Sequence, residues 1–179
     1  MTILCDNREP HGAGGLLHPW ASFWPTGVRV VRGTLETGDV ALAALPDGAV
    51  VERKTVSDFL GAVGRERKRF DLELKRARYC GSFLIIVEGT LGDVLTANHA
   101  RGQLSEAAIL GTIASWSRRG APVLFAGGQR MAAEIAFRFL SGQVREIERA
   151  AKAVAKAEAI TPWTKLSAAK PQNRTAPTR

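Results

Sequence analysis

The sequence lacks a long hydrophobic run, since its apolar residues are dispersed along all 179 positions. No stretch approaches the roughly 20 apolar residues that a membrane-spanning helix requires, so we expect no membrane partner. Residues 1–6 do not place a basic stretch before a longer apolar one, which argues against a signal peptide. Together these absences predict a cytoplasmic protein.

Cysteine is also scarce. The only two, Cys5 and Cys80, are far apart and lack the close spacing of a metal site. We therefore expect reduced thiols packed in the core of a cytosolic protein. The three histidines show no convincing metal spacing either, and no nucleophile paired with a base suggests acyl transfer.

Acidic residues are outnumbered by basic ones, 17 against 25, so the net charge is +8 and the pI is about 10.2. A basic surface favours polyanions, because each neutralised phosphate releases a counterion. From Arg145 onward eight basic residues face three acidic ones, which leaves +5 in that segment. We expect residues 160–179 to form a basic, disordered tail that grips phosphates without specificity.

Strand-like and helix-like patterns succeed each other along the chain. We expect strands at residues 2–5, 28–32, 39–45, 49–54, 83–87 and 122–126. A Pro-Asp-Gly turn at residues 46–48 should join the third and fourth of these into a hairpin. Helices are expected at residues 55–63, 65–79, 105–118 and 129–159, the last with a break near residues 141–142. This order predicts a single α/β domain over residues 1–159, built around a mixed sheet.

Two acids and a lysine in the predicted hairpin carry the most suggestive chemistry. Asp39 and Glu52 lie on neighbouring strands, and strand alternation puts Glu52 and Lys54 on one face. Magnesium prefers one or two carboxylates together with waters and a substrate phosphate. Arg53 points the other way, where it could pair with an acid or support the site from behind. On these residues alone, a hairpin with solvated charges is at least as good an interpretation.

Further charges close to this hairpin shift the balance. Asp6, Arg8 and Glu9 follow the first strand, and Asp58 lies four residues beyond Lys54, in the first turn of a predicted helix. Like charges this close are unfavourable without a cation. The sequence therefore favours a metal site over a random charged surface.

In order and spacing these segments resemble the nuclease domain of the XPF-type structure-specific endonucleases, within the PD-(D/E)xK nuclease superfamily. The similar segments are Asp6-x-Arg8-Glu9, residues 35–40 with Gly38-Asp39, Glu52-Arg53-Lys54 followed by Asp58, the basic helix from Gly64, and the apolar strand ending in Glu88. The resemblance covers about residues 2–140. It implies a restriction-endonuclease-like three-layer α/β fold, with a central mixed β-sheet flanked by helices.

The resemblance also implies a metal-dependent DNA endonuclease that uses Mg²⁺ or Mn²⁺ and acts in repair or recombination, possible substrates being branched or flap DNA. It implies Asp39 and Glu52 as metal ligands and Lys54 as the catalytic lysine. The remaining active-site members, with roles unassigned, are Asp6, Arg8, Glu9, Arg53 and Asp58. The partner would be DNA, at the nucleoid in a bacterium or virus and in the nucleus of a eukaryote.

Relatives of this type often dimerise through the nuclease domain, which implies a homodimer or heterodimer with its interface on the helices at about residues 129–159. Helix-hairpin-helix and helicase modules are missing from the sequence, so we expect a stand-alone nuclease domain. The alternative is a catalytically silent DNA-binding or scaffold subunit that retains the nuclease fold. Such a subunit is expected to lose the acids or the lysine, and all are present here.

Two further groups of residues leave alternatives open. The basic helix could line a DNA groove or could be a solvated helix with internal ion pairs; its residues are Arg65, Arg67, Lys68 and Arg69. The aromatic cluster Trp20, Phe23 and Trp24 could stack on bases, but core packing is the better interpretation.

Overall fold

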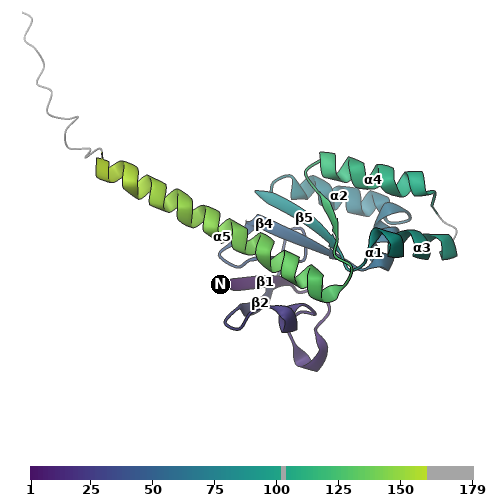
Figure 1. The fold of residues 1–179 in the computed structure, drawn as a ribbon, viewed down its shortest axis with the longest axis horizontal. Helices are drawn as coiled ribbons and strands as arrows, with labels where there is room; N and C mark the ends of the chain where they lie inside the picture. Colours follow the sequence, from purple (N-terminus) through teal and green to yellow (C-terminus); the bar gives the residue numbers. More distant parts are fainter. Residues whose placement is uncertain (102–103, 161–179) are drawn as a thin grey trace, which may run out of the picture. The chain divides into compact units, whose positions relative to one another are not determined.

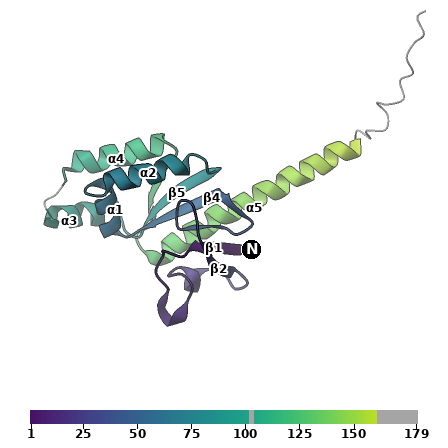
Figure 2. The same cartoon turned by 180° about the vertical axis from the view of Figure 1, so that it is seen from behind.

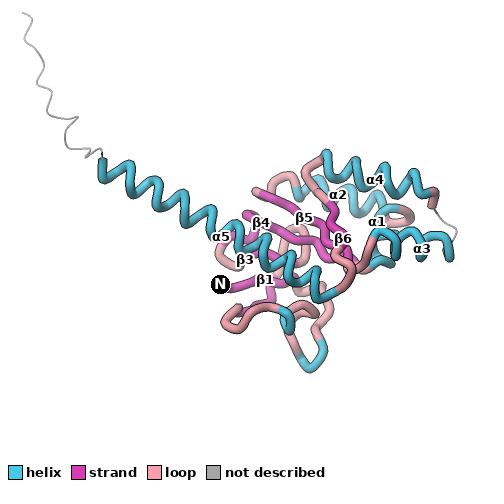
Figure 3. The backbone as a smooth tube through the Cα atoms, in the orientation of Figure 1, coloured by secondary structure: helices cyan, strands magenta, loops and turns pink. Residues whose placement is uncertain are grey.

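The computed structural model describes residues 1–101 and 104–160. These residues form one mixed six-stranded sheet in the order β2-β1-β3-β4-β5-β6 (Figure 3). The strands are β1 (Thr2–Asp6), β2 (Arg29–Gly33), β3 (Val40–Leu42), β4 (Leu45–Lys54), β5 (Ser82–Val87) and β6 (Val123–Phe125). β3 runs antiparallel to β1 and β4, whereas the pairs β1·β2, β4·β5 and β5·β6 are parallel.

Helices flank this sheet on both sides, as Figures 1 and 2 show. The α-helices are α1 (Val56–Val63), α2 (Arg67–Ala77), α3 (Leu91–Arg101), α4 (Glu106–Arg118) and α5 (Gln129–Ile160). Two short 3₁₀ turns, η1 (Ala13–Gly15) and η2 (Ala21–Phe23), lie between β1 and β2. The predicted three-layer α/β fold is confirmed. In the part of the chain that the structure describes, no helix is long and apolar enough to cross a membrane.

Strand β5 carries apolar side chains on both faces, and both faces are buried. Phe83, Ile85 and Val87 pack with α1, α2 and α4 in one core, which also holds Trp116. Leu84 and Ile86 alternate with them and are equally buried. The continuous apolar run therefore reflects a strand with two dry faces, as the sequence predicted.

The opposite face is covered by the β1–β2 connection and the start of α5. Trp20 and Trp24 are buried there, and the Trp24 indole Nε1 donates to the Ala133 carbonyl at 3.1 Å. Their predicted core packing is thus confirmed, whereas Phe23 stays 38% exposed. Both cysteines are free thiols, as expected, with Cys5 buried and Cys80 half-buried.

The predicted hairpin turn at residues 46–48 is wrong. The chain reverses at Ala43-Ala44, and Pro46, Asp47 and Gly48 lie within β4 instead. Leu42 pairs with Leu45 while Ala41 pairs with Val50, so residues 46–49 form a four-residue bulge in β4. The Gly81 amide donates to the Asp47 carbonyl at 2.8 Å. This contact with the start of β5 holds the bulge, and no local sequence pattern reveals it.

The helices differ from the prediction in two places. α3 was not predicted, although Thr90 and Asp93 form the reciprocal side-chain-to-backbone bonds of a capping box, which is its sequence signal. The expected break near residues 141–142 is wrong, because α5 is continuous. The Ser141 hydroxyl donates to the Phe137 carbonyl at 2.7 Å, so it bonds within the helix rather than ending it.

Helix α5 is shared by two compact units, residues 1–143 and residues 144–179. Within the first unit, one face of α5 is buried through Ala132, Ala136 and Leu140. In the second unit the described side chains from residue 145 to residue 158 are exposed. The buried face cannot contact a second protein, so the predicted dimer interface stays a prediction for the exposed part of α5 only. The expected tail, from residue 161 onward, lies outside the described residues.

Gly38 directly precedes Asp39, the first of the two predicted metal ligands, and offers a stability test. Its φ is +72°, and a Cβ there would collide with the Val50 side chain and lie 3.2 Å from the Val51 carbonyl oxygen. We expect Gly38→Ala to lower the free energy of unfolding by about 1–3 kcal/mol, because both strain and overlap oppose it. Gly111→Ala, in open space on α4, is the matched control and should stabilise by about 1 kcal/mol. Urea titration measures the free energy of unfolding of both variants. Equal changes in the two would contradict the conclusion that residue 38 must be glycine.

Candidate active site at the end of strand β4

The last residues of β4 send their side chains to opposite faces of the sheet. Glu52 and Lys54 share a face, whereas Arg53 points to the other one. A charged cavity of about 320 Å³ lies at this end of the strand. The predicted residues that line it are Arg8, Glu9, Asp39, Glu52, Arg53, Lys54, Asp58 and Arg69.

Asp39 and Glu52 come together through the true register of the hairpin. Val40 pairs with Val51, and the Asp39 amide donates to the Val51 carbonyl at 2.9 Å, which brings Asp39 beside Glu52. The Arg53 amide in turn donates to Asp39 Oδ2 at 2.7 Å. Had the chain turned at residues 46–48, Asp39 would lie past the end of the triplet. The bulge therefore helps to set the site.

The two carboxyl groups are held in a way that disfavours their charged forms. Burial, and then the charge of Glu9, raise the pKa of Asp39 to about 7. Burial and the charge of Asp39 raise the pKa of Glu52 well above its usual range, although the Lys54 amine opposes this. Glu52 is 2% exposed, and its Oε2 has no hydrogen-bond partner in the part of the chain that is described.

This pair fits a divalent cation, which would relieve the repulsion and occupy the unpartnered oxygen. Among the described residues no three His, Cys, Asp or Glu side chains are arranged as a ready-made metal cluster. The site thus offers two carboxylates and an open cavity. That donor set suits an ion such as Mg²⁺, which takes its other ligands from water and phosphate.

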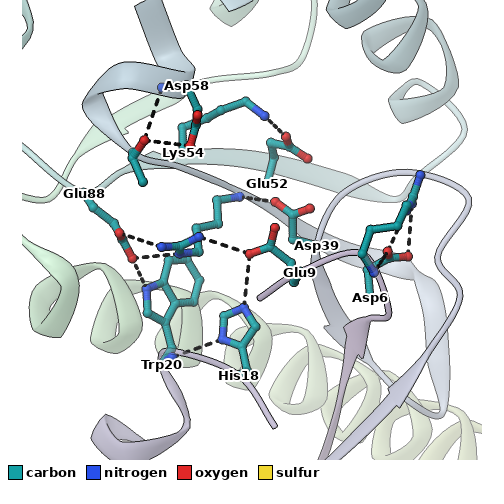
Figure 4. Close-up of polar contacts among 12 residues, drawn as sticks. Asp6, Glu9, His18, Trp20, Asp39, Glu52, Lys54, Asp58 and Glu88 are labelled. Carbon is teal, nitrogen blue, oxygen red and sulfur yellow. Dashed lines mark hydrogen bonds and ion pairs between the residues drawn. The ribbon is translucent and has the colours of Figure 1, made fainter. Parts of the chain in front are cut away.

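Lys54 is fixed from two sides. Its amine forms an ion pair with Glu52 Oε1 (Figure 4). The same amine lies 4.7 Å from the centre of the Phe70 ring. Burial would lower the pKa of Lys54, but the charges of Glu52 and Asp39 outweigh it, so the pKa is raised. Lys54 is therefore a fixed cation at the cavity rather than a proton acceptor.

Arg53 is held on the opposite face of β4 between two acids. Its Nε and one terminal nitrogen donate to the two Glu88 oxygens, each at 2.9 Å, and the other terminal nitrogen donates to Glu9 Oε2 at 3.2 Å. Trp20 Nε1 donates to Glu88 Oε1 at 2.6 Å and completes this support. The prediction that Arg53 pairs with an acid is therefore confirmed, with Glu88 and Glu9 as its partners.

Asp6 and Arg8 form a unit beside the cavity. The Arg8 guanidinium donates to both Asp6 oxygens, at 2.6 and 3.0 Å, and the Leu35 amide donates to Asp6 Oδ2 at 2.8 Å. Asp6 is 1% exposed and does not line the cavity, so the structure separates it from the predicted acid cluster. Figure 4 shows it apart from Asp39 and Glu52. Its carboxylate orients Arg8, which does line the cavity, and its backbone amide donates to the Asp39 carbonyl at 2.8 Å.

The start of α1 and the basic helix complete the rim. Asp58 accepts from the Thr55 hydroxyl at 2.6 Å, and Thr55 is the residue that caps α1. Arg65 and Arg69 are 77% and 78% exposed, and only Arg69 of the four predicted DNA-contacting residues lines the cavity. Arg67 instead donates to the Thr112 hydroxyl on α4 at 3.0 Å, which directs it away from the rim.

Five residues that line or support this site were not predicted from the sequence as site residues. They are His18, Trp20, Phe70, Glu73 and Glu88. Glu73 lines the cavity, and its Oε1 accepts from the Gly38 amide at 3.4 Å. Only Glu88 carried a signal, since a charged residue directly follows the buried strand β5.

Comparisons with known proteins agree with this architecture. A model of the family described as the ERCC4 domain matches residues 6–139. No curated protein matches the sequence significantly. The solved structure "XPF from Aeropyrum pernix" is 22% identical over 89% of this chain and 73% of that chain, with a TM-score of 0.62. The structure "XPF from Aeropyrum pernix, complex with DNA" is 20% identical over 81% of this chain and 66% of that chain, with a TM-score of 0.56. At these identities the likeness shows a shared fold.

Proposed function

Because the chain belongs to the ERCC4 domain family, we propose that it is a metal-dependent endonuclease that hydrolyses phosphodiester bonds in DNA. The observation that carries this proposal is the pairing of Asp39 with Glu52 in a cavity that also holds the Lys54 amine. A silent scaffold would have no use for two buried carboxyl groups whose pKa values are both raised, that of Asp39 by burial and the charge of Glu9, and that of Glu52 by burial and the charge of Asp39.

Asp39 and Glu52 would hold Mg²⁺ or Mn²⁺ at the bottom of the cavity. When bound, such an ion supplies water activation and neutralises the charge that builds up on the phosphate. Lys54 places a permanent positive charge beside Glu52, where it can hydrogen-bond a phosphate oxygen or the attacking water. Phe70 and Glu52 keep that amine in place, so little reorganisation is needed when the substrate binds.

Cations at the rim would receive the DNA backbone. Arg8 is 69% exposed and lines the cavity, as does Arg69. Both can neutralise phosphates, which gives affinity without sequence preference. The similar structure solved as a complex with DNA supports DNA as the substrate class. Flaps, forks and junctions remain the substrates to compare.

A cleavage assay tests the proposal. The full chain is incubated with end-labelled duplex, flap, fork and four-way junction DNA, in the presence of Mg²⁺, Mn²⁺ or chelator. We expect internal cuts that require the metal. Binding without cleavage under every condition would favour the scaffold alternative, and cleavage that persists in chelator would contradict the metal site.

The ring beneath Lys54 gives a more specific prediction. Phe70→Leu removes the cation–π contact at 4.7 Å while keeping an apolar side chain. Such contacts are worth about 0.5–2 kcal/mol, so we expect kcat to fall by about 2- to 30-fold. Phe59→Leu is the control, because Phe59 is fully buried in the same core, whereas the ring under the Lys54 amine is that of Phe70. Equal losses in the two variants would show that the ring acts through packing alone.

A further inference from the structure

A buried histidine, His18, lies next to Glu9 and belongs to none of the motifs described above. His18 is 0% exposed and stacks on Trp24, with ring centres 5.7 Å apart and planes within 5°. Trp20 contacts it edge-on at 5.3 Å. An apolar side chain could fill this aromatic slot without bringing polar atoms into it. The imidazole therefore calls for an explanation beyond packing.

Its hydrogen bonds define which nitrogen carries the proton. The Trp20 backbone amide donates to His18 Nδ1 at 3.1 Å, so Nδ1 is an acceptor and holds no hydrogen. Burial lowers the pKa of His18, even though Glu9 opposes this, and the ring stays neutral. The one ring hydrogen must then lie on Nε2.

That hydrogen faces Glu9. His18 Nε2 lies 3.7 Å from Glu9 Oε2 and has no hydrogen-bond partner among the described residues (Figure 4). An unpartnered buried donor costs about 1–3 kcal/mol, so a small shift of either side chain that closes this gap is favourable. Arg53 donates to the same oxygen at 3.2 Å, and the two donors together fix one side of the carboxylate.

The other side of Glu9 is left for the cavity, which it lines. Burial would raise the pKa of Glu9, but the polar contact with His18 and the charge and hydrogen bond of Arg53 outweigh it and lower the pKa. Glu9 is thus an anion aimed at the site, and its charge contributes to the raised pKa of Asp39. The loop that carries His18 and Trp20 therefore influences the pKa of Asp39 indirectly, through the position and charge of Glu9.

We propose that His18 is a positioning residue, which donates from Nε2 to Glu9 and holds that carboxylate toward the catalytic cavity. The proposal rests on the nuclease function above for its kinetic consequence. The contact itself does not, and the two can be tested separately. Trp20 makes two of the supporting contacts, since its backbone amide donates to His18 and its indole donates to Glu88.

The contact is tested by nitrogen NMR on the full chain labelled with ¹⁵N-histidine, without DNA or metal. We expect His18 to show a protonated Nε2 and an unprotonated Nδ1 throughout neutral pH. Glu9→Gln should shift the Nε2 resonance and leave His99 unchanged, since His99 contacts Glu106 instead. A proton on Nδ1, or an Nε2 signal that ignores Glu9→Gln, overturns the proposal even if the protein cleaves DNA.

The kinetic arm uses His18→Phe, which keeps the stacking and removes the donor, and His18→Gln, which restores an amide donor. We expect kcat to fall by about 10- to 100-fold in the first variant and by only a few-fold in the second, with DNA affinity unchanged. In a Glu9→Gln background, His18→Phe should have no further effect. Additive losses, or equal losses in both His18 variants, overturn the proposal. Absence of cleavage in the wild type would refute the nuclease function and leave the NMR result to decide on the contact.

Discussion

Replacing Asp39 with asparagine is expected to reduce the rate of DNA cleavage by about 10³-fold or more while preserving the fold. The amide has nearly the same shape, so it still accepts from the Arg53 amide at the end of β4. It carries no charge, however, and a cation held by Glu52 alone binds weakly. Loss of about 4 kcal/mol of charge stabilisation in the transition state corresponds to this rate change. Single-turnover cleavage with saturating enzyme measures it.

The same substitution should raise stability when no metal is present. The folded protein holds a proton on Asp39 up to a pKa of about 7, whereas the unfolded chain releases it near its ordinary value of 3.8. The folded state therefore binds more protons between these values, so the wild type loses stability as the pH rises from about 4 to about 7. The Asp39→Asn variant keeps that stability, because its side-chain amide does not titrate. Thermal unfolding in chelator should show a higher Tm for Asp39→Asn at pH 8 and no difference below pH 4.

Adding Mg²⁺ or Mn²⁺ should raise the Tm of the wild type and leave that of Asp39→Asn almost unchanged, because only an ion that binds the folded state stabilises it. Asp47→Asn, an exposed acid in the bulge of β4, is the matched control and should behave as the wild type does. An Asp39→Asn variant that cleaves normally, or that keeps the full metal-induced shift, would remove Asp39 from the site.

Replacing Arg53 with methionine is expected to lower the free energy of unfolding by about 3–5 kcal/mol, more than any other substitution proposed here. The guanidinium separates two largely buried carboxylates, and its removal leaves Glu9 and Glu88 without their cation. Uncompensated buried charges, rather than the lost contacts, account for a loss of this size. A variant this much destabilised approaches the total stability of an ordinary domain, so partial unfolding at 37 °C would accompany it.

Urea titration of the full chain measures this loss, and a second substitution sharpens it. Glu88→Gln in the Arg53→Met background removes one stranded charge and should recover part of the stability, so the double variant is less destabilised than the sum of the singles. Arg65→Met is the control, because its side chain is 77% exposed and its change should stay within about 0.5 kcal/mol. If the free-energy changes of Arg53→Met and Glu88→Gln simply add in the double variant, the two side chains do not interact in the way the ion pair implies.

The parts of the site that could be predicted from sequence are those that depend on local geometry. Alternation along one strand places Glu52 and Lys54 on the same face and Arg53 on the other, whatever the rest of the fold does. The capping of α1 by Thr55 depends on three neighbouring residues and was equally accessible. Asp39 was also expected beside Glu52 from the predicted hairpin, and the resemblance to known nucleases then gave it a role as metal ligand; it lies 14 residues before Arg53 and accepts from its amide.

The parts that could not be predicted join distant segments. Glu88 is 35 residues from Arg53 and 68 from Trp20, and no spacing rule connects them. The turn of the hairpin was misplaced for a similar reason. Pro-Asp-Gly is a good local turn signal, but the contact between Gly81 and Asp47 keeps this segment in the strand. Asp6 differs from the expectation in its position, since its carboxylate is bound by Arg8 and Leu35 and does not line the cavity.

The alternation of β4 has a consequence for how this protein can diverge. Lys54 is held from the helical core by Phe70, while Arg53 is held from the opposite core by Glu88 and Trp20. A pleated strand lies between these two supports, so substitutions in one core need not be matched by substitutions in the other. A lineage could rebuild the aromatic loop that carries His18 and Trp20, and so retune Glu9, without disturbing the lysine. Because the strand separates the two supports, substitutions around Lys54 and substitutions around Arg53 can accumulate independently of each other.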